Sequence, residues 1–191
     1  MADLLFRSRI IVVDTETSGF HQDWSRVVDL AAVVVEPDGT ISERFESLIC
    51  PDIFDAEQAK GAIAIHGITP EMVRGQPNTY MVARTFLGWV QTHGLRWATS
   101  FNTGFDGPHL DRMSIKLSWA SCIMEKATKP MAAADALPML RGGKPKWPKL
   151  SEAGDFFGIP EQGTAHRALP DALRAAGIMV AIRRRELGGA S

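Results

Sequence analysis

Residues 10–20 read Ile-Ile-Val-Val-Asp-Thr-Glu-Thr-Ser-Gly-Phe, and this stretch decides the fold. The first four residues are β-branched and apolar, which is typical of a strand that is covered on both faces. Asp14 and Glu16 follow, and side chains two positions apart point to the same face of a strand, about 6–7 Å apart along it. Such a carboxylate pair is costly as bare charge and is stabilised by a divalent cation. On its own, however, the pair also fits a polar loop after a strand.

The composition is that of a globular protein. The chain has 191 residues, of which 45% are hydrophobic and 23% are charged, and this favours one domain with a proper core. Cys50 and Cys122 have neither the spacing of a metal site nor that of a disulfide framework, so a reducing, cytoplasmic location is expected. The longest apolar run, at 30–35, is too short to cross a bilayer. The N-terminus has no signal-peptide core, and we expect no membrane partner.

The charge pattern restricts the kind of nucleic-acid contact. A net charge of −1 argues against extensive electrostatic coating of a long duplex. Divalent ions bound by carboxylates would reverse the charge locally, so a phosphate held at one spot is compatible with this balance. Residues 141–149 are the most basic segment, Arg-Gly-Gly-Lys-Pro-Lys-Trp-Pro-Lys. They are interpreted as a solvated surface loop or, alternatively, as a loop that binds phosphates and stacks a base on Trp147.

The remaining pattern predicts a mixed sheet covered by helices. Besides the first strand, strands are expected at 27–36, 41–50, 95–101 and 119–124. Helices are expected after the N-cap Asn78, at 105–117, at 131–140, at 150–157 and from Pro170 onward. In mixed sheets of this kind, functional sites lie at strand ends.

Two more segments carry side chains that suit the same site. Asp106 ends the pattern Asn-x-x-Phe-Asp, just past a strand and in the first turn of a predicted helix. Asp171 follows Pro170, which fits the first position of a helix, and His166 lies five residues before it. Each also has a plainer explanation, because a carboxylate in a first turn complements the helix dipole and a histidine can lie on a surface loop.

The chemistry that needs this set is hydrolysis of a phosphodiester with two metal ions. A pair of divalent ions about 3.5–4 Å apart activates the attacking water and neutralises the leaving oxygen. Mg²⁺ takes carboxylate oxygens as ligands and keeps several waters. A base that works near neutral pH must also accept a proton from the water, and histidine is the natural candidate.

The three motifs resemble those of a known family. Asp-x-Glu at 14–16, Asn-x-x-Phe-Asp at 102–106 and His-x-x-x-x-Asp at 166–171 resemble, in order and separation, the exonuclease motifs of the DEDD superfamily. The histidine five positions before the last Asp is similar to the DEDDh branch. Ile-His-Gly-Ile-Thr and His-Arg-Ala-Leu-x-Asp-Ala are close to the wording of its DnaQ-like members, such as the proofreading exonucleases of bacterial DNA polymerase III.

The resemblance implies a ribonuclease H-like α/β fold, a five-stranded mixed sheet flanked by helices. It implies a single exonuclease domain over 1–191 with its core at about 9–183, and two divalent ions, Mg²⁺ or Mn²⁺. The first ion would be held by Asp14, Glu16 and Asp171. Asp14 would also bridge to the second ion, which Asp106 would reach directly or through water, and His166 would be the general base. The residues expected at the substrate end are Thr15, Thr17, Phe20, His66 and Asn102.

The expected function is a metal-dependent 3′→5′ exonuclease that releases nucleoside 5′-monophosphates from single-stranded DNA ends. The alternatives are an exoribonuclease acting on short RNA or RNA 3′ tails, and a catalytically silent nucleic-acid or polymerase adaptor. Pro170 departs from the family pattern, which has a small or acidic residue there. No long extension follows the last predicted helix, which favours a stand-alone nuclease or a proofreader that joins a DNA polymerase in trans.

Overall fold

A computed structural model describes residues 8–19, 24–163 and 166–188, and these form an α/β fold around one sheet. The strands are β1 (Ile10–Thr17), β2 (Val27–Val35), β3 (Ile41–Leu48), β4 (Trp97–Ser100) and β5 (Ser118–Trp119). Their order in the sheet is β3-β2-β1-β4-β5. The β2 strand is antiparallel to both β1 and β3, whereas β1, β4 and β5 are parallel. The expected five-stranded mixed sheet is confirmed.

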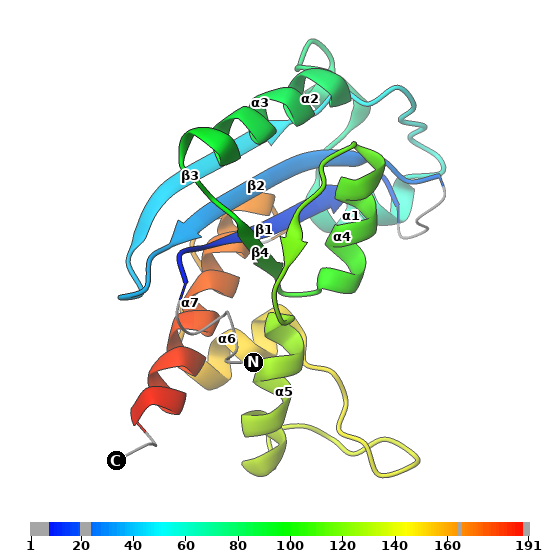
Figure 1. The fold of residues 1–191 in the computed structure, drawn as a ribbon. Helices are drawn as coiled ribbons and strands as arrows, with labels where there is room; N and C mark the ends of the chain where they lie inside the picture. The colour runs from blue at the N-terminus through cyan, green and yellow to red at the C-terminus, as the bar shows by residue number, and fades with distance from the viewer. Residues whose placement is uncertain (1–7, 20–23, 164–165, 189–191) are drawn as a thin grey trace.

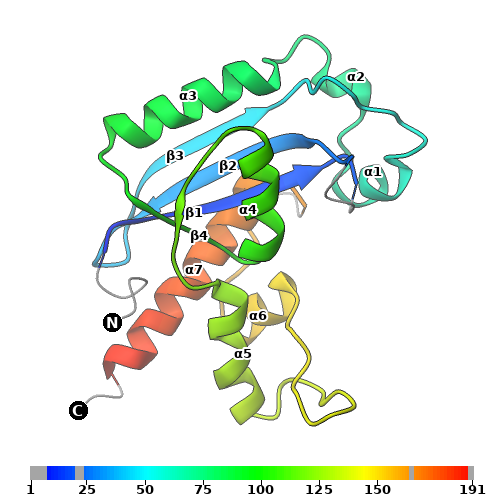
Figure 2. The ribbon, with the colours of Figure 1, turned by 45° about the vertical axis from the view of Figure 1, so that its right-hand side comes forward.

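Helices cover both faces of the sheet. They are α1 (Lys60–His66), α2 (Pro70–Val73), α3 (Thr79–Thr92), α4 (Thr103–Arg112), α5 (Ile123–Ala133), α6 (Leu150–Phe157) and α7 (Ala168–Gly188). Figures 1 and 2 show α3 and α4 on one face, and α7 with α5 and α6 on the other. Within the described residues, no helix combines the length and the apolar character needed to cross a membrane.

Side chains of β1 alternate between two separate hydrophobic cores, one on each face of the sheet. Ile10 and Val12 pack with residues of α5, α6 and α7, whereas Ile11 and Val13 pack with residues of α3 and α4. Side chains two positions apart share a face. The same alternation therefore places Asp14 and Glu16 on the α7 side of the sheet, as predicted from their spacing.

Small residues let the start of α7 approach the sheet closely. Ala31 on β2 is the cross-strand partner of Asp14. It packs in a buried cluster with Ala168 and Ala172 of α7. Because none of these side chains extends beyond Cβ, the first turn of α7 lies directly against the sheet at the level of Asp14. This close contact brings Asp171 to the end of β1.

Two predictions between β4 and α6 are wrong. The strand expected at 119–124 is only the short β5, and α5 begins at Ile123; short apolar runs do not distinguish strands from buried helix starts. The helix expected at 131–140 contains only the last turn of α5. Asp135 has a left-handed φ of 53°, and Ala136 N–H donates to the carbonyl of Met131 at 2.9 Å. This Schellman-type end stops the helix before the alanine-rich sequence does.

The last helix starts earlier than predicted. Pro170 was expected at the first helical position, but α7 begins at Ala168. Asp171 N–H donates to the carbonyl of Arg167 at 3.1 Å, so Pro170 lies within the first turn. A proline is tolerated there because the N–H groups of a first turn have no intrahelical acceptor.

Candidate active site

Three carboxylates meet at the end of β1. One oxygen from each of Asp14, Glu16 and Asp171 lies within 4.8 Å of the other two. Asp14 and Glu16 share one face of β1 because side chains alternate along a strand, and Asp171 lies in the first turn of α7. The register of β1 against β2 shifts between Glu16 and Thr17, and irregularities of this kind often re-aim side chains next to active sites. Glu16 and Asp171, 155 positions apart in the sequence, thus meet at the end of one strand, as the motifs predicted.

Burial and mutual repulsion favour the protonated form of these groups. Burial is the largest cause that raises the pKa of Asp14 well above its usual range, and the charges of Asp106 and Glu16 add to it. Burial, followed by the charge of Asp171, raises the pKa of Glu16 to about 8. Burial also raises the pKa of Asp171, although the neighbouring His166 lowers it. Opposite charge at this spot would relieve both effects.

Asp106 lies outside the three-carboxylate cluster but lines the same pocket. It is the fourth residue of α4 and is buried. Its Oδ1 accepts a hydrogen bond from the Thr15 hydroxyl at 2.7 Å. Thr15 belongs to the alternate set of β1 side chains, which faces α3 and α4, and its hydrogen bond ties the first turn of α4 to β1. Burial raises the pKa of Asp106 to about 6, and the Thr15 hydrogen bond opposes the rise.

His166 lines the same pocket as the carboxylates. It is exposed, and it comes two residues before α7. Its φ of 57° is left-handed, a conformation that residues other than glycine adopt only where their surroundings hold it. The expected base and the expected metal ligands are therefore brought together, although no hydrogen bond ties the imidazole to a fixed position among the described residues.

The residues expected to contact substrate occupy different positions around the pocket. Asn102 lines it and makes no side-chain capping bond to α4. Thr17 lines it too, but its hydroxyl donates to the Gly19 carbonyl at 2.6 Å, and the Thr15 hydroxyl is bound to Asp106. Phe20 lies outside the described residues. Contact of these residues with substrate stays a prediction.

His66 connects the end of α1 to the end of β1. Ile68 N–H donates to its Nδ1 at 2.9 Å, so the ring proton is on Nε2, which lies 3.1 Å from the Thr17 carbonyl. Burial lowers the pKa of His66, which favours this neutral form. Both ring nitrogens are therefore engaged within the protein, and His66 meets the pocket with its ring carbons.

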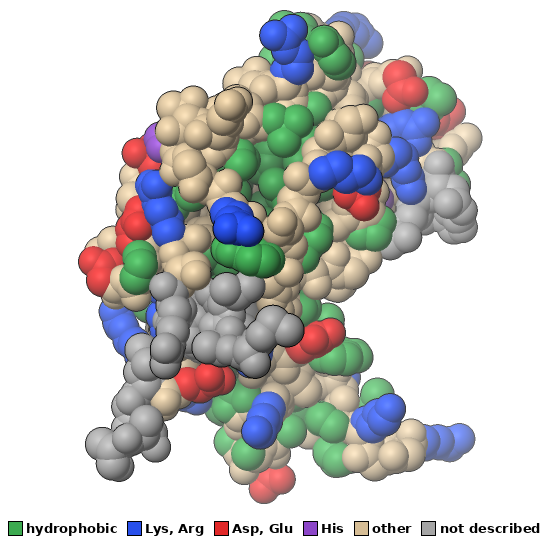
Figure 3. Space-filling model, viewed as in Figure 1, with side chains coloured by type: hydrophobic (Ala, Val, Ile, Leu, Met, Phe, Trp, Pro, Cys, Tyr) green, Lys and Arg blue, Asp and Glu red, His purple; other side chains and the backbone are tan. Residues whose placement is uncertain are grey.

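The pocket at this site has a volume of about 280 Å³. Figure 3 shows the surface hollowed, at the right of the view, between the part formed by α4 and the part formed by α5 and the segment after it. Sequence reasoning missed several residues of the pocket, which come from α1, α4 and α6: Ala62, Phe105 and Leu150. Nothing in their local sequence distinguishes them from ordinary core residues.

Sequence reasoning also missed Asp29. It is the third residue of β2, its side chain is 0% exposed, and it is the cross-strand partner of Glu16. Its Oδ2 accepts a hydrogen bond from Arg167 Nε at 2.9 Å. Burial raises the pKa of Asp29, and Arg167 opposes that rise. The available signal was a single acidic residue in the apolar run Val-Val-Asp-Leu-Ala-Ala.

Comparison with known proteins identifies the family. A model of the exonuclease family named RNase T matches residues 11–179. This chain belongs to the DnaQ-like exonuclease family. Its members are hydrolases that act on phosphodiester bonds, and the three-carboxylate cluster at the end of β1 is consistent with the metal site of this family.

Individual relatives agree with this assignment. The chain is 31% identical to the DNA polymerase III subunit epsilon of Aquifex aeolicus over 95% of its own length and 84% of the relative's. It is 28% identical to the corresponding subunit of Pasteurella multocida over 86% of its length and 64% of the relative's. The fold is shared with E. coli exonuclease I, with a TM-score of 0.72 at 18% identity. The matched region covers 96% of this chain but only 42% of that enzyme.

We predict that the stability of the metal-free protein falls as the pH rises toward 8. The ordinary pKa of a glutamate is 4.5 and that of Glu16 is about 8. Between these values the folded protein holds a proton that the unfolded chain releases, so raising the pH from about 5 to about 8 destabilises the fold. Unfolding temperatures measured in EDTA should show this fall, and saturating Mg²⁺ should reduce it.

The matched control is Glu16→Gln, which cannot titrate. Its unfolding temperature in EDTA should depend less on pH over the same range. Identical pH dependence in the variant and the wild type would contradict the raised pKa of Glu16.

Proposed function

We propose that this protein is a metal-dependent 3′→5′ exonuclease that acts on single-stranded DNA ends and releases nucleoside 5′-monophosphates. The observation that carries the proposal is the gathering of Asp14, Glu16 and Asp171 at one strand end, with His166 lining the same pocket. We also propose that residues 1–191 act as one exonuclease domain, in the cytoplasm, and that a DNA polymerase is a partner in trans.

The donor set fits hard divalent cations. The available ligands are carboxylate oxygens, which Mg²⁺ and Mn²⁺ prefer. Burial, together with the charges of neighbouring carboxylates, raises the pKa of Asp14 and brings that of Glu16 to about 8. Asp14, Glu16 and Asp171 would hold one ion, and Asp14 with Asp106 would hold the other. When bound, such ions polarise the phosphodiester and the attacking water and neutralise the leaving oxygen.

The chain's own residues supply positioning and proton transfer. The carboxylates would hold the cations, and through them the scissile phosphate, at the end of β1. His166 accepts the proton of the attacking water at an imidazole nitrogen, and its exposed position allows it to release that proton to solvent. Asn102, which lines the pocket and does not cap α4, offers its side-chain amide to the terminal nucleotide. Thr15 keeps Asp106 oriented through its hydroxyl.

Two observations support a single-stranded substrate. The pocket of about 280 Å³ suits one terminal nucleotide rather than a paired end. A projecting segment, residues 139–149, leads directly into Leu150 of the pocket lining and extends beside α5 (Figure 1). Trp147 on this segment is 52% exposed, and an exposed aromatic among lysines suits base stacking with phosphate contacts. E. coli exonuclease I, which shares the fold, has a known structure in complex with a dT13 oligonucleotide.

RNA is the second candidate substrate, because one side-chain contact to a 2′-hydroxyl can separate RNA from DNA. A silent adaptor is the third candidate function. All four carboxylates and His166 are present in the chain, which favours catalysis over the adaptor. Matched 5′-labelled DNA and RNA oligonucleotides, incubated with Mg²⁺ or with EDTA, distinguish the three candidates. A DNA exonuclease shortens the DNA, an exoribonuclease shortens the RNA, and an adaptor cleaves neither.

We predict that Asp14→Ala and Asp171→Asn each abolish cleavage while the fold survives. Each change removes a carboxylate that a metal ion would need, and each also relieves repulsion in the metal-free site. The wild type should therefore give a Mg²⁺-dependent ladder that shortens from the 3′ end, and neither variant should give one. The unfolding temperature in EDTA should not fall.

The control for these variants is Asp38→Ala. Asp38 is an exposed carboxylate whose Oδ1 accepts hydrogen bonds from Thr40 in the β2–β3 turn, away from the pocket residues. It should keep wild-type cleavage. A ladder of normal intensity from Asp14→Ala or Asp171→Asn would refute the metal-ligand assignment.

We predict that His166→Ala lowers the rate of cleavage by at least about 100-fold at neutral pH, the usual contribution of a general base. Binding of the metal should persist, because the three carboxylates are intact. Single-turnover rates at saturating Mg²⁺ measure the effect. A rate within a few-fold of the wild type would remove His166 from the mechanism.

A further inference from the structure

Asp29 is a buried acidic residue outside the three-carboxylate cluster. Its neighbours along β2, Val28 and Leu30, are fully buried and apolar, and Asp29 itself is 0% exposed. A buried ion pair is often replaceable by apolar residues of similar volume without loss of stability. Packing alone therefore gives no reason for a carboxylate at this position, and the reason must lie in what Asp29 holds.

The contacts of Asp29 are directed at the start of α7. Its Oδ2 accepts hydrogen bonds from Arg167 Nε at 2.9 Å and from the backbone N–H of Ala168 at 3.3 Å. Its Oδ1 is buried without a hydrogen-bond partner in the described part of the chain. The carboxylate thus caps the first N–H of α7 and forms an ion pair with the residue just before it.

These contacts fix the two residues that directly follow His166. Arg167 is 138 residues from Asp29 in sequence, so the contact is a tertiary restraint rather than a local turn. His166 has a left-handed φ and an exposed side chain, and its backbone needs a firm attachment to keep that conformation. On its C-terminal side, the two bonds from Asp29 attach this backbone to the sheet, in addition to the hydrogen bond between the His166 backbone and Asp171.

Asp29 also adjoins the metal-ligand strand. Glu16 is its direct cross-strand partner, and both residues lie on the α7 side of the sheet. One side chain therefore connects the strand that delivers Asp14 and Glu16 to the backbone that carries His166.

We propose that Asp29 is a positioning residue for His166: through Arg167 and Ala168 it sets where the imidazole stands relative to the carboxylates of β1. The inference rests on the proposed function, because it takes His166 as the general base. It does not place Asp29 in contact with substrate or metal.

The test is a double-mutant cycle on the rate of 3′-end hydrolysis, with wild type, Asp29→Ala, His166→Ala and the double variant. Asp29→Ala should lower kcat about tenfold or more, the usual cost of losing a partner that orients a catalytic side chain, with KM nearly unchanged. In the His166→Ala background the same change should cause no further loss, because the residue it positions is gone. The rise in unfolding temperature with Mg²⁺ should persist in Asp29→Ala.

The conservative variant Asp29→Asn separates positioning from charge. An amide oxygen can accept both bonds that Oδ2 accepts, and the amide nitrogen would take the place of the unpartnered Oδ1. Asp29→Asn should therefore keep most of the activity that Asp29→Ala loses.

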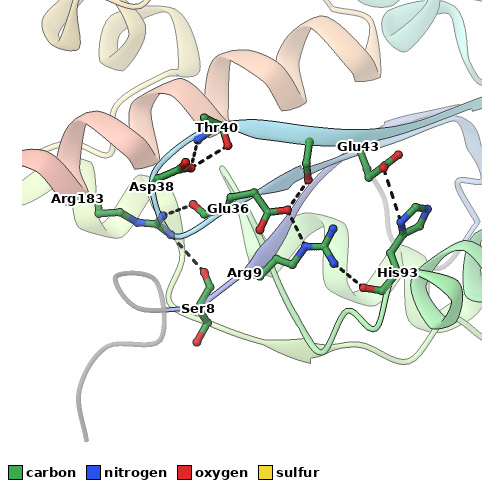
Figure 4. A network of polar contacts seen from close by, with 9 residues as sticks. Ser8, Arg9, Glu36, Asp38, Thr40, Glu43, His93 and Arg183 are labelled. Atoms are coloured by element: carbon green, nitrogen blue, oxygen red, sulfur yellow. Dashed lines mark hydrogen bonds and ion pairs between the residues drawn. The ribbon is translucent and has the colours of Figure 1, made fainter.

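The matched control is Glu36→Ala, just beyond the opposite end of β2. Glu36 accepts a hydrogen bond from Arg9 Nε at 2.8 Å, in a network that also includes Ser8, Arg183 and His93 (Figure 4). This variant also loses a carboxylate–arginine contact, so it should lower the unfolding temperature and leave kcat unchanged.

Three outcomes would overturn the inference. Asp29→Ala could keep wild-type kcat, it could cause an equally large loss in the His166→Ala background, or His166→Ala could itself be fully active. If Asp29→Ala does not fold, Arg167→Ala takes its place in the cycle with the same expectations. A wild-type protein without metal-dependent cleavage would instead refute the proposed function, and that result is seen before any variant is made.

Discussion

Three half-buried carboxylates repel one another at the end of β1, and this repulsion is the main constraint on the structure. Asp14, Glu16 and Asp171 have oxygens within 4.8 Å of one another, and burial raises the pKa of each. A fold keeps such a cluster only if other interactions hold it. Here, β1 is held between two strands and two apolar cores.

The attachment of α7 is the second half of that arrangement. Ala31 and Ala172 allow the helix to approach the sheet, and Asp29 caps the helix through Ala168 N–H. The same attachment determines the positions of Asp171, inside the first turn, and of His166, just before it. The strand that carries Asp14 and Glu16 is therefore related to His166 through α7 rather than through a direct bond between them.

The sequence predicted the sheet because strands depend on local periodicity, and it predicted the motif residues because the three motifs resemble those of a known family. The alternation in β1 was enough to place Asp14 and Glu16 on one face. The roles of Asp29 and Thr15 were not predictable in this way, because each depends on a partner 138 or 91 residues away. Asp106 was expected with the other carboxylates, and it lines the same pocket as they do, bound to Thr15 of β1. The early end of α5 depends on the left-handed backbone of Asp135. The alanine-rich sequence around it favours a continuing helix and gives no sign of this ending.

The central claim is that the carboxylate cluster holds protons until a divalent cation replaces them. Calorimetric titration of Mg²⁺ into the metal-free protein near pH 7, in two buffers of different ionisation enthalpy, tests it most directly. We expect binding whose heat depends on the buffer, with release of about one proton or more per protein. Binding with the same heat in both buffers, or the absence of binding, would contradict the account.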